Sequence, residues 1–159
     1  MVRSIVHILC TLLAVSCAVA SKTYSVVGKH PFSECQVACE GAGARMLCIT
    51  TAAEQAVLMN IITSYTWIGL EETGGEGHWE WIEGCDSQYL DGWAAYEPNN
   101  FGGDETKGAI VPGSAAIMDA FQDEGIKQDD PSVYVYYQLK PGWQDWGTGD
   151  ALLECACEY

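Results

Sequence analysis

The densest group of potential ligand atoms in this chain is the tetrapeptide Glu97-Pro98-Asn99-Asn100. An acidic pair, Asp104-Glu105, follows it, and Trp143-Gln144-Asp145 adds an amide and another acid. Carboxylate and amide oxygens are the ligands with which proteins build the Ca²⁺ shell of about six to eight oxygens. These residues could therefore gather around one hard cation. The alternative for the tetrapeptide is a polar turn built on its proline.

The first twenty residues have the pattern of a secretory signal peptide. Arg3 precedes an apolar run, Ile5–Ala14, and the segment ends in the small residues Ala18-Val19-Ala20. The run is shorter than the ~20 apolar residues that a membrane span needs, and no later segment supplies them. We expect a signal peptide at 1–20 and a secreted, extracellular domain at 21–159, without membrane insertion. A buried N-terminal helix is the alternative.

Residues 21–159 have the length of a single domain with a real core. Of the eight cysteines in the sequence, Cys10 and Cys17 lie in the expected leader. An even number remains, which in an oxidising compartment predicts three disulfides. Zinc is the alternative, but it is disfavoured because the spacings contain no paired C-x2-C motif. The remaining cysteines are Cys35, Cys39, Cys48, Cys85, Cys155 and Cys157.

The chain is strongly acidic. It has 22 acidic and seven basic residues, for a net charge of −15. Such a charge opposes binding to the phosphates of nucleic acids and to anionic membrane surfaces. It favours solubility, cation binding, or contact with basic or mineral surfaces.

The residue pattern predicts two early helices and several short strands, an α+β order. One helix is expected over 31–39. A second begins at Thr51, which forms a capping box with Glu54, and continues through Val57, Leu58, Ile61 and Ile62 on one face. Trp79 and Trp81 alternate, so both rings should face the same side of a strand. Residues 84–103, rich in Gly, Asp, Asn and Pro, should form a long loop. Strands are expected at 23–28, 67–70, 79–81, 108–111, 133–139 and 152–159.

Taken in order, these motifs resemble those of a C-type lectin-like domain, and the resemblance covers essentially all of 21–159. It implies a disulfide-stapled α+β fold with two loops, in which a small antiparallel sheet has two flanking helices. A long irregular loop would carry a Ca²⁺ and ligand site. The residues that carry the resemblance are Cys39, Glu54 in its capped helix, Trp67-Ile68-Gly69-Leu70, Trp79-x-Trp81-x-x-Gly84, Trp93, Glu97-Pro98-Asn99, Trp143-x-Asp145 and Cys157-Glu158-Tyr159.

The resemblance also implies a disulfide from the first helix to the C-terminus, Cys39–Cys157. Three pairings then remain for the other four cysteines. Cys35 lies one helical turn (~5.4 Å) before Cys39, and Cys155 lies two strand residues (~6.8 Å) before Cys157. These similar rises favour Cys35–Cys155, which leaves Cys48–Cys85.

Two departures from the family pattern stand out. The positions of a second family disulfide are occupied by Thr106 and Thr148, so the long loop lacks that bond. The segment 107–142 is longer than the family usually has there. It contains a group of acids, Asp119, Asp123, Glu124, Asp129 and Asp130.

The resemblance implies that one set of residues binds both Ca²⁺ and carbohydrate. Here Asp104 is one methylene shorter than the usual Glu, and Gln144 one methylene longer than the usual Asn. Ca²⁺ tolerates variable geometry, so a weak but working site is expected; a metal-free loop is the alternative. The set is Glu97, Asn99, Asp104, Gln144 and Asp145.

The resemblance further implies recognition of vicinal sugar hydroxyls. Glu-Pro-Asn is the order of mannose-, glucose- and fucose-type sites, not of galactose-type sites, and Pro98 would follow a cis peptide bond. We expect no enzyme, because no feature assigns an acid and a nucleophile to pairs such as Glu71/Glu72, and His30 and His78 show no triad spacing. The alternative function is a protein-interaction or mineral-matrix module that uses the acidic surface without a sugar. The sequence predicts no particular oligomeric state.

Overall fold

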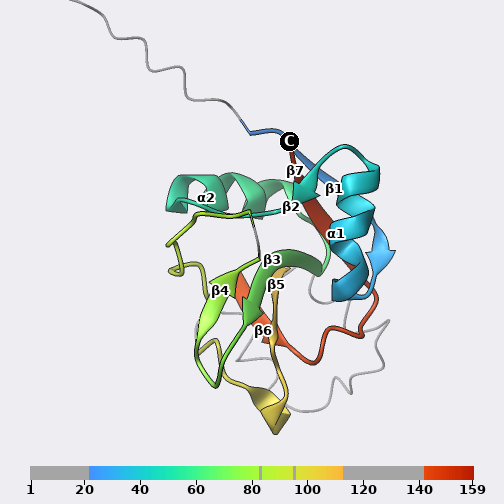
Figure 1. Ribbon diagram of the computed structural model, residues 1–159. Coiled ribbons are helices and arrows are strands. Elements are labelled where there is room, and N and C mark those ends of the chain that lie inside the picture. The colour runs from blue at the N-terminus through green and yellow to red at the C-terminus, as the bar shows by residue number, and fades with distance from the viewer. Residues whose placement is uncertain (1–21, 83, 95, 113–141) are drawn as a thin grey trace, which may run out of the picture.

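The computed structural model describes residues 22–82, 84–94, 96–112 and 142–159. The leader 1–20, the expected strand 133–139 and the acids of the longer segment lie outside these residues. In the described part, two helices flank one sheet (Figure 1). The elements are β1 (Tyr24–His30), α1 (Phe32–Gly41), β2 (Arg45–Met46), α2 (Ala52–Ile61), β3 (Thr66–Glu72), β4 (Trp79–Trp81), the 3₁₀ turn η1 (Phe101–Gly103), β5 (Lys107–Val111), β6 (Gly142–Trp146) and β7 (Leu153–Glu158).

The sheet is mixed. Its main order is β1-β7-β3-β5-β6, with β2 also paired to β7 and β4 to β3. All pairs are antiparallel except β3 with β7, where Thr66 and Trp67 lie opposite Glu154 and Cys155 in parallel register. The expectation of an antiparallel sheet is corrected in this respect. A parallel pair needs a long connection, and most of the long loop and β4 to β6 lie between β3 and β7 along the chain.

Helix α1 is held against β7 by two disulfides. The Cα atoms of Cys35 and Cys155 are 5.4 Å apart, and those of Cys39 and Cys157 are 5.5 Å apart. The third bond joins Cys48, which lies two residues after the end of β2, to Cys85 in the long loop. All three pairings expected from the sequence are present. Because the first two bonds are one helical turn apart, they determine both the position and the rotation of α1 on the sheet.

Helix α2 begins at the expected cap. The Glu54 amide donates to the Thr51 hydroxyl at 3.1 Å, and the Glu54 carboxylate reaches back to the Thr50 amide at 2.8 Å. Of the four apolar residues expected on one face, only Leu58 and Ile62 are buried. Val57 and Ile61 are 52% and 51% exposed. Leu58 and Ile62 are four residues apart and lie above one another on the helix, and so do Val57 and Ile61. Only the first pair is buried against the sheet.

The core lies on both faces of the sheet, because neighbouring strand residues point to opposite sides. Trp67 of β3 and Cys155 of β7 pack with α1, whereas Ile68 and Ala156 pack with α2 and the long loop. The second half contains an aromatic cluster, defined as Trp79, Trp81, Tyr89, Trp93 and Trp143. Edge-to-face contacts join its rings at centroid distances between 4.8 and 5.7 Å.

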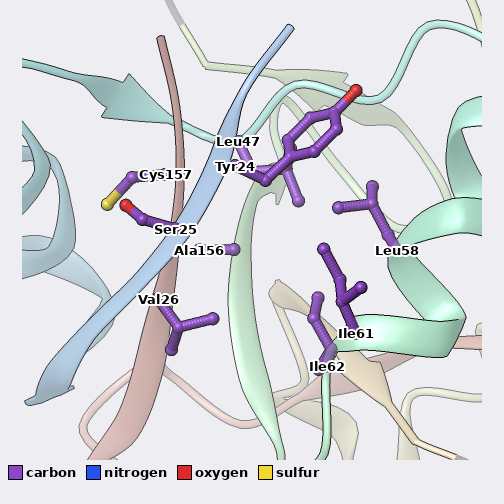
Figure 2. Close-up of a pocket in the computed structure, with 9 residues that line it drawn as sticks. All are labelled: Tyr24, Ser25, Val26, Leu47, Leu58, Ile61, Ile62, Ala156 and Cys157. Atoms are coloured by element: carbon purple, nitrogen blue, oxygen red, sulfur yellow. The ribbon is translucent and has the colours of Figure 1, made fainter.

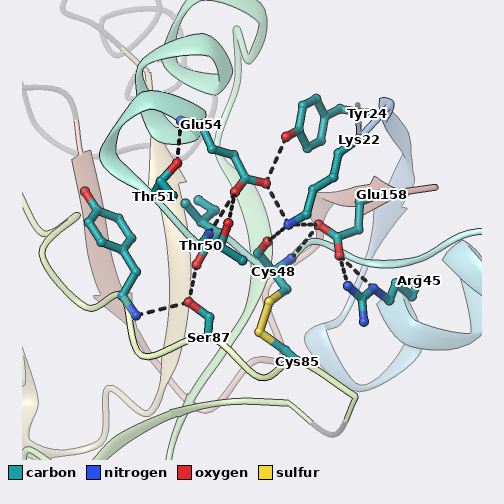
Figure 3. Close-up of polar contacts among 12 residues, drawn as sticks. Lys22, Tyr24, Arg45, Cys48, Thr50, Thr51, Glu54, Cys85, Ser87 and Glu158 are labelled. Carbon is teal, nitrogen blue, oxygen red and sulfur yellow. Dashed lines mark hydrogen bonds and ion pairs between the residues drawn. A yellow bond between two sulfur atoms is a disulfide. The ribbon is translucent and has the colours of Figure 1, made fainter. Parts of the chain in front are cut away.

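A polar network fastens the start of β1 to α2 and β7 (Figure 3). The Lys22 ammonium lies 2.9 Å from Glu54 and 3.0 Å from Glu158, and the Tyr24 hydroxyl donates to Glu54 at 2.8 Å. Glu158 is only 2% exposed and also accepts from Arg45 at 2.6 Å. Burial favours a higher pKa for Glu54, but the hydrogen bonds from Lys22, Thr50 and Tyr24 outweigh it and lower the pKa.

The two ends of the described chain lie side by side, since the Tyr159 amide donates to the Thr23 carbonyl at 2.9 Å. In Figure 1 they meet at the top of the molecule, whereas η1 and the residues around it form the opposite tip. The candidate ligand residues of the 97–105 segment are therefore presented far from both ends.

Candidate functional site

Strand β6 carries the acidic end of the candidate site and is paired on both sides. Its register with β5 places Asp145 opposite Gly108 and Gln144 opposite Ala109. On the other side, the Trp143 amide donates to the Gly92 carbonyl, and the Ala94 amide donates to the Trp143 carbonyl, both at 2.9 Å. Gly92 is required for this approach, because a Cβ there would come within 2.1 Å of the Trp143 ring. The long loop and β6 are thus one unit.

Asp145 holds the tetrapeptide 97–100 in place. One carboxylate oxygen accepts from the Asn99 amide at 3.0 Å, and the other accepts from the Asn100 amide at 2.6 Å. The Asn99 side-chain amide donates to the Glu97 carboxylate at 2.8 Å. The Glu97-Pro98 peptide bond is cis, as the resemblance implies. Glu97, Asn99 and Asp145, three of the five expected ligands, are therefore in contact.

The carboxylates of this region lie close enough to perturb one another. Burial and the adjacent Asp145 carboxylate raise the pKa of Glu97 to about 8. Burial, together with Asp145 and Asp104, raises the pKa of Glu105 to about 7, although the Phe101 amide donates to it. Glu97 and Glu105 each prefer to be neutralised, and either a proton or a bound cation can do this.

Among the described contacts, none joins the other two expected ligands, Gln144 and Asp104, to Glu97, Asn99 or Asp145. Gln144 is 5% exposed and precedes Asp145 in β6. Asp104 lies in an exposed position just after η1, and its field acts on Glu105. Within the described residues, no group of three or more His, Cys, Asp or Glu side chains is gathered closely enough to hold a metal ion. A cation at this site would therefore require the amide oxygens as well as the acids.

Three residues connect the loop, and of these the sequence reasoning named Asn100 and Glu105 but missed Glu76. Asn100 has a left-handed backbone (φ 47°), which Asn tolerates better than most residues. Its side-chain amide donates to Glu76, and its side-chain oxygen accepts from the Glu105 amide at 3.1 Å. The second Asn of the tetrapeptide was a signal for such a turn. Nothing local in the sequence indicated that Glu76, in the turn between β3 and β4, would reach it.

The two threonines at the absent family disulfide are adjacent to the same loop. The Thr106 amide donates to the Gly147 carbonyl at 2.9 Å, and the Thr148 hydroxyl donates to Asp150 at 2.8 Å. Trp146, the last residue of β6, packs on Tyr65 at a centroid distance of 4.9 Å and is a structural residue. Backbone pairing therefore links the 97–106 segment to the end of β6 where the family has a covalent bond.

A separate apolar groove lies between β1, β7 and α2, near the chain ends (Figure 2). Its volume is about 210 Å³. The side chain of Val26 faces those of Ile61 and Ile62 across it. None of the expected ligand residues lines this groove. It is lined by Tyr24, Ser25, Val26, Leu47, Leu58, Ile61, Ile62, Ala156 and Cys157.

Comparison with known proteins agrees with this geometry. The model of the Lectin C-type domain family matches residues 28–123, more than half of the chain. The chain belongs to the C-type lectin domain family. In Mus musculus, C-type lectin domain family 4 member F is 34% identical over 77 residues, which are 46% of this chain and 14% of that protein. C-type mannose receptor 2 of Mus musculus is 35% identical over 80 residues, 48% of this chain and 5% of that protein.

A solved structure supports the same fold. The C-type lectin domain of murine dendritic cell inhibitory receptor 2, in complex with N-glycan, has a TM-score of 0.62 at 20% identity, covering 87% of this chain and 91% of that one. The chain spans only a small part of the two longer mouse relatives. C-type lectin domains are binding proteins without enzymatic activity, generally bind carbohydrate, usually with Ca²⁺, and are generally extracellular or lumenal. None of the helices in the described residues is long and apolar enough to cross a membrane.

Proposed function

We propose that this C-type lectin domain is a secreted protein that binds mannose-, glucose- or fucose-type glycans in a Ca²⁺-dependent way. The observation that carries the proposal is the contact of Glu97 and Asn99 with Asp145 across the cis Glu97-Pro98 bond. This contact brings a carboxylate acceptor and an amide donor of the 97–100 segment against a second carboxylate, that of the buried Asp145 in β6. The name of one relative, C-type mannose receptor 2, refers to the same class of sugar.

The residues present suit a hard cation. The Glu97 and Asp145 carboxylates lie together, and their mutual repulsion is relieved when a cation neutralises them. Amide oxygens complete the oxygen donors that Ca²⁺ prefers. We assign the ligands to Glu97, Asn99, Asp104, Gln144 and Asp145. When bound, Ca²⁺ would supply the coordination positions that two vicinal sugar hydroxyls fill.

The protein's own groups would orient the sugar. A carboxylate can only accept hydrogen bonds and an amide NH₂ donates them, so Glu97 and Asn99 distinguish the two directions of a hydroxyl pair. Asp145 holds the Asn99 and Asn100 amides and so positions both groups. A site built to pair with particular hydroxyls discriminates against other sugars, because an unpaired buried polar group costs ~1–3 kcal/mol.

Binding of methyl α-mannoside in the presence and absence of EGTA tests the proposal. Calorimetry should show a Ca²⁺ dissociation constant on the order of 10⁻⁴–10⁻³ M, and sugar binding that EGTA abolishes. Asp145→Ala should remove both. Asp150→Ala is the matched control, since Asp150 is exposed and bonds only with Thr148 among the contacts described. Sugar binding that persists in EGTA, or its absence at millimolar Ca²⁺, would contradict the proposal and favour a sugar-free interaction module.

Two further variants test the individual roles. Reversing the polar groups with Glu97→Gln and Asn99→Asp should shift preference from mannose to galactose. Gln144→Asn should strengthen Ca²⁺ binding if the extra methylene weakens the site. If neither wild type nor the Gln144→Asn variant shows any heat of Ca²⁺ binding, the proposed metal site is refuted.

A further inference from the structure

One aromatic side chain at the tip of the molecule is almost wholly in water. Phe101 is 81% exposed, the highest value among the exposed large hydrophobic residues of the described chain. An apolar ring gains free energy when it leaves water, and the fold does not provide this burial for Phe101. Single exposed apolar residues are common on protein surfaces, so its position and its support decide whether it has a role.

Its position is directly beside the proposed sugar site. Phe101 follows Asn100 in the chain and is two residues from Asn99. On the other side of the tetrapeptide, Tyr96 is 70% exposed and has a left-handed backbone, with φ 71°. Two exposed aromatic residues thus bracket the four residues 97–100. The other strongly exposed apolar residues are mostly aliphatic and lie on helices or near the C-terminal strand.

The turn that carries Phe101 is well supported. The Phe101 amide donates to the Glu105 carboxylate at 2.6 Å. The Gly103 amide closes the turn on the Asn100 carbonyl at 2.9 Å, and the Asn100 amide is bound to Asp145. The ring is therefore presented outward by a backbone bonded to the same acids that form the site. Because the backbone is already held, a ligand that covers the ring has to order only the two side-chain torsions of Phe101.

We propose that Phe101 contacts the second residue of an oligosaccharide whose terminal residue is held at Glu97 and Asn99, so that the protein prefers oligosaccharides to monosaccharides. The inference rests on the proposed function. One face of a pyranose ring presents C–H groups, and an aromatic ring can cover such a face as it covers other apolar surface. The hydroxyl pair of the terminal sugar would anchor the oligosaccharide, and Phe101 would add selectivity for the second sugar that is linked to it.

The test compares methyl α-mannoside, an α-linked mannobioside and octyl mannoside in Ca²⁺. Wild type should bind the mannobioside about fivefold more tightly than methyl α-mannoside, as expected for one aromatic contact. In Phe101→Ala this preference should vanish while methyl α-mannoside binding stays within about twofold of wild type, and Phe101→Trp should restore it. Val37→Ala, which removes an exposed apolar side chain on α1 (68% exposed), should match wild type.

Each other outcome is informative. If Phe101→Ala weakens both mannosides equally, the residue supports the loop and the inference is overturned; the same follows if the variant changes neither. If octyl mannoside binds more tightly than methyl α-mannoside but the mannobioside does not, Phe101 contacts an alkyl chain and not a second sugar, and the inference is also overturned. If wild type binds none of the three ligands, the proposed function itself fails, and that result is distinct from a lost preference.

Discussion

The two disulfides between α1 and β7 should stabilise the fold in a strongly non-additive way. The bond Cys39–Cys157 closes a loop with a sequence separation of 118. In a chain-entropy model a loop of that length is worth about 4.9 kcal/mol. Once it is closed, Cys35–Cys155 closes only a small ring, formed by about eight residues, which is worth about 2.5 kcal/mol. Because either bond can close the long loop, losing one should cost about 2.5 kcal/mol and losing both about 7.4 kcal/mol.

The perturbation is a double-mutant cycle in which each pair of cysteines is replaced by alanine, singly and together. All four residues are fully buried and belong to one core cluster, so packing losses accompany each change. The individual packing losses cancel in the coupling term, which retains the loop-closure coupling and any packing coupling between the two neighbouring pairs. Urea unfolding gives the free energies. A fixed concentration of a stabilising osmolyte keeps every variant folded at the start of the titration.

The expected coupling is about 2.4 kcal/mol beyond the sum of the single losses. Losses that add within about 0.5 kcal/mol would refute the reasoning, since they would show that the bonds act independently. The bond Cys48–Cys85 provides a second check. Its sequence separation of 37 gives about 4 kcal/mol, and no other bond closes the same loop. Removing this bond should therefore reduce the free energy of unfolding more than removing either of the other two bonds alone.

Three further predictions concern single residues. Gly92→Ala should destabilise the protein by about 3 kcal/mol in urea unfolding because its Cβ overlaps the Trp143 ring, whereas Gly41→Ala, which meets nothing within 4 Å, should be neutral or slightly stabilising. Equal stability of the two variants would contradict the close approach. The pKa of Glu54 is lowered on folding, so its contribution is complete above its unfolded pKa of 4.5 and is lost as pH falls through the lower folded value. Glu54→Gln should therefore flatten the acid limb of stability against pH, and an unchanged limb would rule out this role. Glu158→Gln should cost about 2–3 kcal/mol because Glu158 is a buried partner of two cations; the exposed control Glu40→Gln should change the same free energy of unfolding by less than about 0.5 kcal/mol.

Features with a local cause were predictable from the sequence. Thr51 and Glu54 mark the start of α2 because the capping bonds lie within one turn. Trp79 and Trp81 are both buried, as alternation in one strand requires. The pairing Cys35–Cys155 followed from the similar rise of one helical turn and two strand residues, once the resemblance supplied Cys39–Cys157.

Features that depend on pairing between distant segments were not predictable in this way. The strand at Gly142–Trp146 is formed by its contacts with β5 and with the loop at Gly92, and its own sequence has only a weak strand signal. The parallel pairing of β3 with β7 is likewise a property of the whole sheet. The contacts of Asn100 with Glu76 and Glu105 bring together two turns that are separated in the chain. The proposed ligands Asp104 and Gln144 came from the family pattern, and their roles remain predictions.

The aromatic cluster gives the protein an internal optical reporter. Trp143 lies in contact with Trp81, Tyr89 and Trp93, and it directly precedes Gln144 and Asp145 in β6. Indole emission responds to nearby fields and to movement of neighbouring rings. Any event that draws the Asp145 carboxylate away from the loop amides would act one residue from a fluorophore, so we expect that occupancy of the proposed site can be followed in solution without a label.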